Sequence, residues 1–437
     1  MRVTIVGTGY VGLVTAVCLA EIGHHVICLD IDQNKINLLK SGKSTIYEPE
    51  IEYYMQKNKD NLKYTTQIEE AYKMPEVIII CVGTPQGENG KPNMQSIKNV
   101  IKQIEKNLKN DCIIALKSTV PVGTNKKIED YLNSKINKDI KIEVVSNPEF
   151  LSQGTAINDT IRAKRIILGV NSKHAENVMK KLYDKYNQRY LVTNRESAEI
   201  IKYASNTFLA LKISYINEIA NLCEDYDANI DDVSKGIGLD DRIGEKYLKA
   251  SIGYGGSCLP KDTEALNWIF SQSNNNSKLI EAVRSTNNNQ KFKLLEKARK
   301  YYKDFNGIKV AILGVTFKPN TDDLRESPAV ENIKLLLKEG AKISVFDPIG
   351  LNNLRKLKLN LNYCENIQDA IKDADICLIF TEWNEIKKFE PENFEKEMKI
   401  PIIIDGRNCY DIKNMSECDV IYESIGRKTI KNHICSN

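Results

Sequence analysis

The sequence feature that most constrains the fold is a strand, a glycine-rich turn, a helix and a second strand within the first thirty residues. An apolar run at 2–6 is followed by GTGYVG at 7–12, which has the spacing G-x-G-x-x-G. Apolar residues recur at helical spacing over 13–22, and a second apolar run at 25–29 ends in Asp30. Three spaced glycines alone are a weak signal. The whole order, however, is the dinucleotide-binding fingerprint of a doubly wound α/β domain.

Each residue of this fingerprint has a physical role. Gly7 makes the tight turn, Gly9 lets the backbone approach a pyrophosphate, and Gly12 permits close packing of helix and strand. The amino terminus of the helix offers amide donors to the phosphates. Asp30 can accept hydrogen bonds from both ribose hydroxyls and would repel a 2'-phosphate, so we expect NAD rather than NADP. The alternative is a fortuitous glycine turn.

Three more apolar runs predict buried parallel strands, at 77–82, 112–116 and 141–146. The turns that follow them contain prolines and carry Thr84, Thr119 and Glu149. In open α/β sheets the ligand lies outside the carboxyl ends of the strands, so we expect these three residues on one ligand-binding rim. Taken singly, each also fits ordinary turn chemistry, because Thr-Pro and Asn-Pro begin turns anywhere.

A long amphipathic helix is predicted from about residue 197. Its apolar residues recur at three- and four-residue steps: Ile201, Ala204, Phe208, Leu211, Tyr215, Ile219 and Leu222. Lys202 and Asn206 are four apart on a different face, where a lysine and an amide can together hold a developing oxyanion. The alternative is a solvated lysine and an ordinary polar position. A mostly helical block continues to about residue 289, and we expect it to form the contact of a homodimer.

The stretch GYGGSCLPKD at 253–262 carries the most chemistry. Gly255 and its neighbour lack side chains, so a substrate or another backbone can come close. Cys258 stands before Pro260, which favours a helix start, and near Lys261, so its thiolate would be stabilised as a nucleophile requires. The alternative is that Cys258 is one buried small hydrophobe among several.

From Lys309 the first signature partly recurs, which predicts a second doubly wound domain. The matching segments are KVAILG with RVTIVG, KISVFD with HVICLD, DICLIFTEW with VIIICVGTP, and PIIIDGRN with CIIALKST. The glycine pattern is incomplete after Gly314, so a dinucleotide pyrophosphate would not fit in the same way.

This second domain offers cations instead. Lys318, Arg325 and Arg407 would cluster at the strand ends, where the phosphates of a nucleotide can be held. The alternative is a structural salt-bridge network with Asp322 and Asp323.

Composition excludes several classes. The 437 residues predict two or three domains, and a net charge of +4 with interspersed signs gives no case for a nucleic-acid partner. The eleven cysteines are scattered without a CxxC pair, so we expect neither a metal site nor a disulfide framework. We expect no membrane span and a cytoplasmic location. The four histidines are expected at the surface or in turns, which leaves acid–base chemistry to other residues.

The motifs together resemble one family almost from end to end. They are VGTGYVG, KSTVPVGT, NPEFL, EIIKYASNTFLALKISYINE, GLDDRIG, GYGGSCLPKD and FKPNTDDLRESP, in this order. The chain resembles the UDP-glucose/GDP-mannose dehydrogenase family of nucleotide-sugar 6-dehydrogenases. The resemblance implies two doubly wound Rossmann-like domains joined by a long central helix and a helical dimerisation region. The implied boundaries are 1–195 for NAD, 196–300 for the helical domain with Cys258, and 301–437 for the UDP-sugar.

The resemblance also implies the activity, an NAD-dependent four-electron oxidation of UDP-glucose to UDP-glucuronate. On this reading Cys258 captures an aldehyde, giving a thiohemiacetal that is oxidised to a thioester. Lys202 and Asn206 stabilise the oxyanions, and Asp262 orients the hydrolytic water. Thr119 and Glu149 resemble the residues around that water and the proton transfers.

Binding residues carry over by motif. The cofactor contacts implied are Gly7, Gly9, Tyr10, Val11, Gly12, Asp30, Lys35, Thr84, Thr119, Lys261 and Arg325. The substrate contacts implied are Glu149, Phe150, Leu151, Lys202, Asn206, Arg242, Tyr247, Gly255, Lys318 and Arg407. Arg242 resembles an arginine that reaches the sugar site of a neighbouring subunit. One position departs from the family, since Gln153 replaces a frequent second glutamate; an acid–base role cannot apply there, although a hydrogen-bonding role can.

Three rival functions stay open. The nearest is the same reaction on a UDP-N-acetylhexosamine, with a GDP-sugar less favoured. A two-electron hydroxyacid dehydrogenase can share the Rossmann domain and the Lys-xxx-Asn pair but has no use for Cys258. A non-catalytic nucleotide-sugar sensor would require a broken catalytic position, and Lys202, Asn206, Cys258 and Asp262 are all intact.

Overall fold

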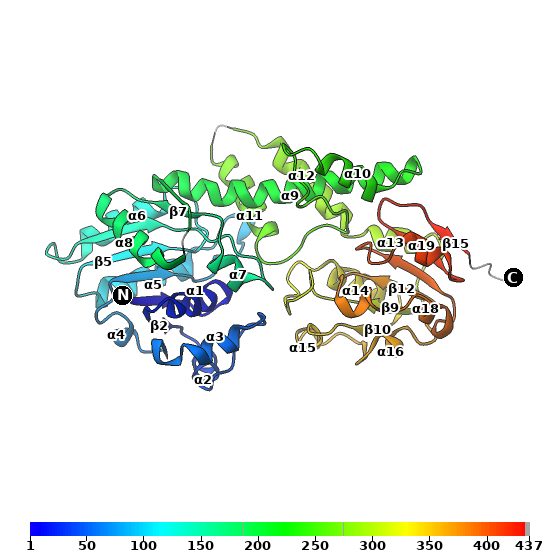
Figure 1. The fold of residues 1–437 in the computed structure, drawn as a ribbon, viewed down its shortest axis with the longest axis horizontal. Helices are drawn as coiled ribbons and strands as arrows, with labels where there is room; N and C mark the ends of the chain where they lie inside the picture. Colours follow the sequence, from blue (N-terminus) through cyan, green and yellow to red (C-terminus); the bar gives the residue numbers. More distant parts are fainter. Residues whose placement is uncertain (187, 274, 433–437) are drawn as a thin grey trace. The chain divides into compact units, whose positions relative to one another are not determined.

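The protein is described by a computed structural model that covers residues 1–186, 188–273 and 275–432. These residues divide into two compact units. Unit 1 comprises the described residues of 1–205 and 264–275, and unit 2 comprises those of 206–263 and 276–437. Each unit contains one predominantly parallel sheet with helices on both faces (Figure 1). The predicted domain boundaries at 195 and 300 stay a prediction.

The sheet of unit 1 has eight strands in the order β3-β2-β1-β4-β5-β6-β7-β8. The strands are β1 Arg2–Val6, β2 His25–Leu29, β3 Leu62–Thr65, β4 Val77–Ile80, β5 Cys112–Leu116, β6 Ile142–Ser146, β7 Ile166–Gly169 and β8 Tyr190–Thr193. Among the described strands of this sheet, only the β6–β7 pair is antiparallel. The strand order reverses beside β1, and such a reversal is where dinucleotides bind in doubly wound folds.

Helices cover both faces of this sheet. They are α1 Tyr10–Glu21, α2 Gln33–Lys40, α3 Ile51–Lys57, α4 Ile68–Ala71, α5 Gln95–Asn107, α6 Thr124–Lys135, α7 Ala156–Ile161 and α8 Lys173–Leu182, with 3₁₀ turns at Lys59–Asn61, Glu88–Gly90 and Asp184–Tyr186. Ile79 of β4 packs into the core with α1, whereas its neighbours Ile78 and Ile80 pack into the opposite core with α5 and α6. β4 and β5 are therefore apolar at every position, which is why they read as continuous runs in the sequence.

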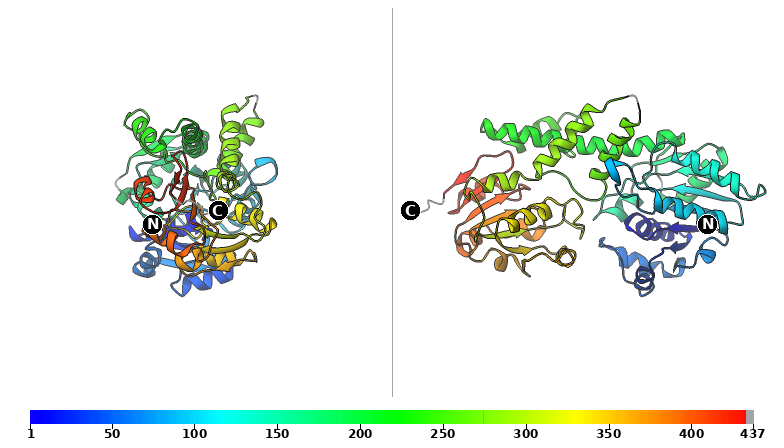
Figure 2. Two further views of the ribbon diagram at one scale, coloured as in Figure 1. Left: turned by 90° about the vertical axis from the view of Figure 1, so that its right-hand side faces the viewer. Right: turned by 180° about the vertical axis from the view of Figure 1, so that it is seen from behind.

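Unit 2 repeats this design with a seven-stranded sheet in the order β11-β10-β9-β12-β13-β14-β15. The strands are β9 Lys309–Leu313, β10 Lys342–Phe346, β11 Asn362–Tyr363, β12 Ile376–Ile379, β13 Ile402–Asp405, β14 Ile421–Ser424 and β15 Ile430–Lys431. The helices are α10 Ile230–Gly238, α12 Lys278–Gln290, α13 Lys293–Ala298, α14 Pro328–Lys338, α15 Leu351–Arg355, α16 Ile367–Ile371, α17 Asn384–Lys387, α18 Glu392–Glu397 and α19 Ile412–Ser416. Figure 2 shows these strands from two further directions. The predicted fold class, two doubly wound Rossmann-like sheets, is confirmed.

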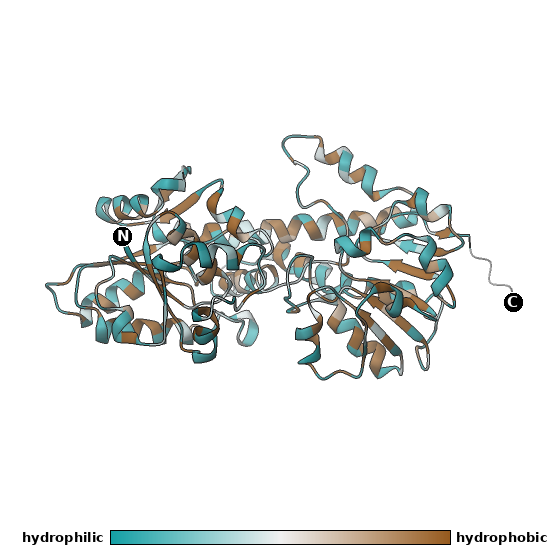
Figure 3. Ribbon diagram, turned by 60° about the horizontal axis from the view of Figure 1, so that its bottom comes forward, coloured by the Kyte–Doolittle hydropathy of each residue, from teal (hydrophilic) through white to brown (hydrophobic). Residues whose placement is uncertain are grey.

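Hydropathy follows the layers of each unit. Figure 3 shows the strands of both sheets predominantly in brown and the outer turns of many helices in teal. Both cores of unit 2 contain strand residues, since Ile312 packs on one face of β9 and Leu313 on the other. No described helix is both long enough and apolar enough to cross a bilayer.

The predicted long helix is present as α9, Arg195–Asp225, and a second helix, α11, spans Leu259–Ser271. The apolar residues of α9 differ in how far they are buried. Ile216 and Ala220 pack into the core of unit 2. Phe208, Tyr215 and Leu222, which recur every seven residues, instead have 60%, 51% and 52% of their surface exposed. We call these three residues the α9 stripe.

The histidines are expected at the surface or in turns, and His24 meets only the second of these expectations. His24 lies in the predicted turn after α1 but is buried rather than at the surface, and its ring nitrogens contact the carbonyl of Leu182 and the terminal amine. His433 lies outside the described residues. The three asparagines at 287–289 stand at a helix end, because α12 ends at Gln290.

Candidate active site

The glycine loop of unit 1 has the geometry that a dinucleotide requires. Gly7 has a φ of +94° and its amide donates to the carbonyl of Leu29 at 2.8 Å. A Cβ on Gly12 would lie 1.9 Å from the carbonyl oxygen of Gly7, so only glycine permits this packing. A Cβ on Gly9 would meet no atom within 4 Å, and no side chain caps the first turn of α1. The amides of this turn are therefore available to donate to a pyrophosphate.

Asp30 follows β2 and is half-buried at the same edge. Its Oδ2 accepts hydrogen bonds from the amide and hydroxyl of Thr8, both at 2.7 Å, and its Oδ1 accepts from the amide of Asp32. Burial opposes the charge, but these hydrogen bonds and the ammonium of Lys35 outweigh it and lower the pKa of Asp30. The carboxylate is therefore ionised at neutral pH, as a ribose acceptor must be. These residues fit NAD.

A buried glutamate that the sequence analysis did not single out connects this loop to the 150–156 segment. Glu48 accepts hydrogen bonds from the hydroxyl of Tyr10, from the amide of Gly154 at 2.6 Å and from the amide of Ala156 at 2.6 Å. The amide of Gly154 also contacts the Tyr10 hydroxyl at 2.9 Å. Tyr10 and its neighbour Val11 are half-buried in the first turn of α1. No sequence pattern distinguishes Glu48, because it lies in an irregular segment and its partners are between 38 and 108 residues away.

Two of the three predicted rim residues touch each other. The hydroxyl of Thr84 donates to the carbonyl of Thr119 at 2.8 Å, so the loops after β4 and β5 lie side by side. Glu149 follows β6, the next strand of the same parallel set. It is buried with only 7% of its surface exposed. The three residues thus stand on the carboxyl edge that the sequence predicted.

Lys202 and Glu149 form a buried ion pair. The ammonium of Lys202 donates to the side-chain Oε1 and to the main-chain carbonyl of Glu149, both at 2.8 Å. It also lies 5.3 Å from the ring centroid of Phe150. The other oxygen of Glu149 accepts from the amide of Leu151. The carboxylate of Glu149 balances the charge of the buried ammonium. Gln153, two residues after Leu151, is half-buried.

Cys258 stands directly before α11 and is the one exposed cysteine among the described residues. Its carbonyl accepts the first hydrogen bond of the helix, from the amide of Asp262 at 2.9 Å. Asp262 is buried, with 1% of its surface exposed, and receives hydrogen bonds from Asn206 at 2.6 Å and from Lys261 at 2.5 Å. The thiol thus lies at a helix amino terminus, one turn from a buried carboxylate whose two oxygens are both engaged.

Arg325 approaches the thiol from another segment of unit 2. Its guanidinium makes a bidentate pair with Asp323, which raises the pKa of Arg325, and the thiolate of Cys258 contributes to the same shift. A Cβ on Gly255 would lie 2.3 Å from the carbonyl oxygen of Glu326. The space beside Gly255 is therefore occupied by another backbone, the second of the two possibilities that the sequence left open.

Arg407 is held by main-chain carbonyls. It is buried after β13 and donates to the carbonyls of Phe380 and Phe317, with a longer contact to that of Gly253. Lys318 is half-buried and lies 5.7 Å from the ring centroid of Phe317. The hydrogen bond between Arg407 and Phe317 thus brings the segments of Arg407 and Lys318 together, as the sequence predicted. Arg325 instead pairs with Asp323, so part of the predicted alternative, a structural salt-bridge network, is also present.

The acidic residue of the second sheet is committed to the fold. Asp347 follows β10 as Asp30 follows β2, but only 2% of its surface is exposed. Its Oδ2 accepts from Val315, Thr316 and the indole of Trp383, and its Oδ1 accepts from Ile349 and Gly350. A ribose cannot reach it. The expectation that this loop does not bind a dinucleotide as the first loop does agrees with this arrangement.

Arg242 and Tyr247 lie in the segment after α10. Arg242 is exposed and its guanidinium contacts Asp240 at 2.5 Å. Tyr247 has a positive φ of 65° and 42% of its surface exposed. The ammonium of Lys212, on α9, donates to the carbonyl of Ile243 at 3.0 Å and so fixes this turn beside the helix.

Comparisons with known proteins cover the whole length. The NAD-binding, central and UDP-binding domain models of the UDP-glucose/GDP-mannose dehydrogenase family match residues 1–187, 196–289 and 311–412. The chain is 43% identical over 433 residues to the UDP-glucose 6-dehydrogenase YwqF of Bacillus subtilis, covering 98% of both chains. It is 41% identical over 436 residues to the UDP-glucose 6-dehydrogenase of Rhizobium meliloti, covering 98% of this chain and all of that one.

Two solved structures are similar over nearly their full length. A UDP-glucose dehydrogenase from Pyrobaculum islandicum has a TM-score of 0.91 at 30% identity, with 98% of both chains covered. A UDP-D-ManNAc dehydrogenase from Pyrococcus horikoshii has a TM-score of 0.85 at 28% identity, with 99% of this chain and all of that chain covered. The predicted family and the predicted NAD-binding domain are confirmed. The chain belongs to the UDP-glucose/GDP-mannose dehydrogenase family, whose NAD-binding, central and UDP-binding domains it contains in order.

Proposed function

We propose that this chain is an NAD-dependent UDP-glucose 6-dehydrogenase that oxidises the primary alcohol of the sugar to a carboxylate. One observation carries the proposal. An exposed Cys258 stands at the amino terminus of α11, and the buried carboxylate of Asp262 is held one turn away by Asn206 and Lys261. A four-electron oxidation requires a nucleophile that keeps the intermediate aldehyde bound, and a thiol at a helix start meets this need.

The cofactor is held by the glycine loop and Asp30. We assign the pyrophosphate to the amides that follow Gly9 and the ribose hydroxyls to Asp30, with Lys35 and Thr84 nearby. When bound, NAD accepts the electrons of each of the two oxidations. The balanced reaction is UDP-glucose + 2 NAD⁺ + H₂O giving UDP-glucuronate + 2 NADH + 3 H⁺.

The covalent steps take place on Cys258. Its thiolate attacks the aldehyde carbon and forms a C–S bond, giving a thiohemiacetal whose oxygen is negatively charged. Oxidation of this adduct gives a thioester. Water then attacks the thioester carbonyl, the C–S bond breaks, and the thiolate leaves as the carboxylate forms. Asp262 is the proposed group that orients this water, because its carboxylate is fixed one turn from the sulfur.

Lys202 and Asn206 are the proposed oxyanion donors. They are four residues apart in α9, so both project from one side of the helix, and both are buried. In the structure each donates to a carboxylate, Lys202 to Glu149 and Asn206 to Asp262. The carboxylates thereby hold the two donors in fixed orientations, which is what stabilisation of a transient charge requires. Thr119 and Glu149 are proposed to assist the proton transfers.

The nucleotide sugar is proposed to bind through the second sheet. Lys318 and Arg407 would serve the UDP moiety, and Arg242 would reach the sugar site of a neighbouring subunit, as in the resemblance. Phe150, Leu151, Tyr247 and Gly255 complete this proposed set, while Lys261 and Arg325 are assigned to the cofactor. The exposure of Arg242 on a turn fixed beside α9 supports a contact across an interface.

The relatives favour glucose over an N-acetylhexosamine. The curated relatives at 41–43% identity are named UDP-glucose 6-dehydrogenases, whereas the UDP-D-ManNAc dehydrogenase is 28% identical.

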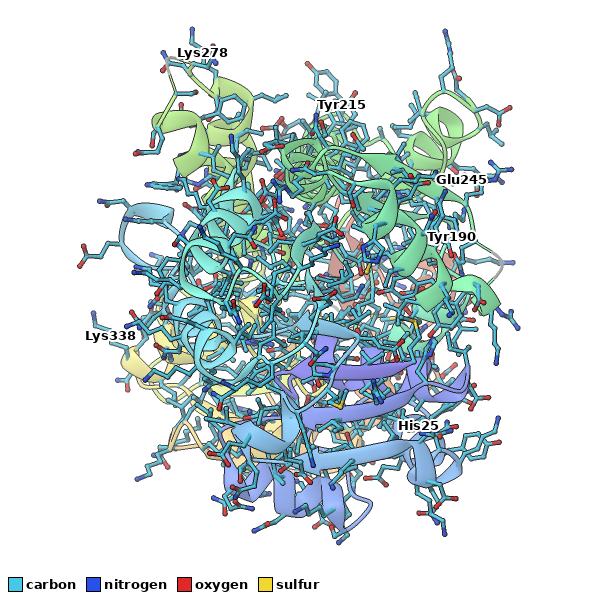
Figure 4. The ribbon with its side chains drawn as sticks, turned by 90° about the vertical axis from the view of Figure 1, so that its left-hand side faces the viewer. His25, Tyr190, Tyr215, Glu245, Lys278 and Lys338 are labelled. Atoms are coloured by element: carbon cyan, nitrogen blue, oxygen red, sulfur yellow. The ribbon has the colours of Figure 1, made fainter. Side chains whose placement is uncertain are left out.

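The described cysteines are all free, which supports the further proposal of a cytoplasmic enzyme. The α9 stripe supports the proposed homodimer; Figure 4 shows Tyr215 projecting outward from its helix.

The decisive experiment counts NADH per sugar. We expect two NADH for each UDP-glucose consumed, and kcat/KM at least about 10²-fold lower for UDP-N-acetylglucosamine and UDP-N-acetylmannosamine. Cys258→Ser should lower kcat by at least about 10²-fold, because the poorly nucleophilic hydroxyl cannot replace the thiolate. One NADH per product, or a Cys258→Ser variant with full turnover, would instead indicate a two-electron dehydrogenase.

A further inference from the structure

The segment that leads into the catalytic turn is buried but has no regular structure. Residues 251–256 are all buried, and none belongs to a helix or a strand. Buried backbone amides and carbonyls need partners, which in this segment no helix or sheet ladder provides. The amides of Ile252 and Gly256 donate to the main-chain carbonyls of Gly406 and Arg325. Ser251 and Tyr254 are instead paired with amide side chains on neighbouring helices of unit 2.

One pair of amide side chains holds Ser251. Its amide donates to Oδ1 of Asn217 at 2.8 Å, and its carbonyl accepts from Nε2 of Gln290 at 2.8 Å. Gln290 is oriented in turn by a hydrogen bond from Asn221. Asn217 and Asn221 belong to α9, and Gln290 is the last residue of α12.

A single asparagine holds both polar groups of Tyr254. Asn287 accepts from the amide of Tyr254 at 2.8 Å and donates to its carbonyl at 3.1 Å. This two-point pairing resembles one rung of a β-ladder made by a side chain. The fit is close, because a Cβ on Gly253 would lie 2.6 Å from Oδ1 of Asn287. Asn287 has only 3% of its surface exposed, whereas Asn288 and Asn289, the rest of the asparagine run, are exposed.

We call the two hydrogen bonds between Asn287 and the backbone of Tyr254 the Asn287 clamp. Only three residues separate this clamp from Cys258. Tyr254 is followed by Gly255, Gly256 and Ser257, and then by Cys258. The amide of Gly256 donates to the carbonyl of Arg325 at 2.9 Å, so the far side of the short connection is also fixed. A displacement of Tyr254 can therefore be absorbed by only these three residues before it reaches Cys258, which stands directly before α11.

We propose that Asn287 is a positioning residue for the nucleophile, and that its side-chain amide, with those of Gln290 and Asn217, fixes Cys258 at the amino terminus of α11. The proposal deepens the proposed function and rests on it for the role of the sulfur. It assigns the first of the three asparagines in the run at 287–289 to the catalytic turn. Without this clamp the buried amide and carbonyl of Tyr254 lose the two hydrogen bonds that Asn287 supplies, and the thiol is held less firmly against the helix terminus and Arg325.

The test compares Asn287→Ala with Asn288→Ala in the full-length protein. Two readouts are measured: steady-state kinetics with UDP-glucose, and the rate at which iodoacetamide alkylates Cys258 without substrate or cofactor, followed on the Cys258 peptide by mass spectrometry. For Asn287→Ala we expect kcat to fall about 10²-fold with KM within about threefold, as for a misplaced reacting group. We expect its alkylation rate at pH 7 to fall at least about threefold, because the thiolate loses stabilisation. Asn288→Ala should match the wild type in both.

A second variant covers the case in which Asn287→Ala does not fold. Asn287→Asp keeps an acceptor for the amide of Tyr254 but sets a carboxylate against its carbonyl, and we expect a smaller loss in both readouts. A folded Asn287 variant with the kcat and alkylation rate of Asn288→Ala would overturn the proposal. The alkylation readout needs no sugar, so it decides the positioning role even if the wild type fails to oxidise UDP-glucose. Normal activity with unchanged alkylation would refute the clamp alone.

Discussion

Glu199 is a buried carboxylate three residues before Lys202 in α9. Its oxygens accept from the amides of Gly123 and Asn125 and from the side chain of Asn125, at 2.6–2.9 Å, at the amino terminus of α6. Burial nevertheless raises the pKa of Glu199, since it outweighs these hydrogen bonds, and the charge of Glu196 acts in the same direction. The helix of Lys202 is thereby tied to the loop that carries Thr119.

This raised pKa predicts a pH dependence of stability. Below the ordinary glutamate pKa, Glu199 is protonated in both the folded and the unfolded chain, and its contribution to the free energy of unfolding is fully present. As the pH rises through the folded pKa the buried charge forms and that contribution is lost. Urea unfolding of the wild type and Glu199→Gln from pH 4 to pH 8 should show a difference in free energy, wild type minus variant, that decreases with pH. A difference that stays level or increases would contradict this account.

Some residues of the candidate site could be predicted from the sequence, and others could not. Cys258 and Lys202 stand out in the sequence because their chemistry is specific and their flanking glycines or helical spacing are visible. Glu199 and Asn287 occupy ordinary helix positions, and Glu48 an ordinary loop position. Their roles depend on partners between 33 and 108 residues away. Such contacts are set by tertiary packing, which no local pattern in one sequence encodes.

Among the elements, the irregular segment between α2 and α3 connects two functional loops. Glu48 receives three hydrogen bonds, one from Tyr10 in the glycine loop's helix and two from the backbone of the 150–156 segment. Thr45, in the same segment, contacts the carbonyl of Thr8. The cofactor loop and the segment that follows Glu149 therefore share one buried carboxylate.

Removal of this carboxylate should damage both loops. Glu48→Ala removes the acceptor of the Ala156 amide and of the Tyr10 hydroxyl, whereas the amide of Gly154 keeps the Tyr10 oxygen as an acceptor. At about 1–3 kcal/mol for each group that loses its partner, we expect the free energy of unfolding to fall by about 3 kcal/mol. The KM for NAD should rise at least about fivefold, because Tyr10 loses its anchor. Thermal or urea unfolding and initial rates at varied NAD measure these effects. Glu69→Ala, at an exposed position, serves as the control. An equal change in stability and in the KM for NAD in both variants would show that the hydrogen bonds of Glu48 are unimportant.

The strands were predictable because of how they are buried. Central parallel strands are covered on both faces, so each reads as a continuous apolar run, and the observed bounds of β1, β2 and β5 coincide with the predicted ones. The helix pattern was less informative. Periodicity marks α9 as amphipathic, but it does not state which apolar residues face the chain's own core and which face outward.

At the scale of the whole molecule, one design is used twice for different purposes. Asp30 and Asp347 occupy equivalent places after the second strand of each sheet. Asp30 is half-buried and ionised at the edge of an open glycine loop. Asp347 is enclosed by amides and an indole. The repeat in the sequence predicted the second fold correctly, and the incomplete glycine pattern was the signal that its ligand site differs.

The α9 stripe predicts how two copies associate. Phe208, Tyr215 and Leu222 are large, apolar and at least half exposed on one side of a helix, an arrangement typical of an association surface. We expect the wild type to sediment as a dimer at micromolar concentration. Phe208→Glu would bury an unpaired charge at the interface, which should weaken the dimer at least about 10²-fold and give a monomer. Leu357→Glu, at an exposed apolar residue outside the stripe, should remain dimeric. A monomeric wild type, or a Phe208→Glu variant with unchanged sedimentation, would rule out this surface; loss of activity on dissociation would support the role of Arg242 across the interface.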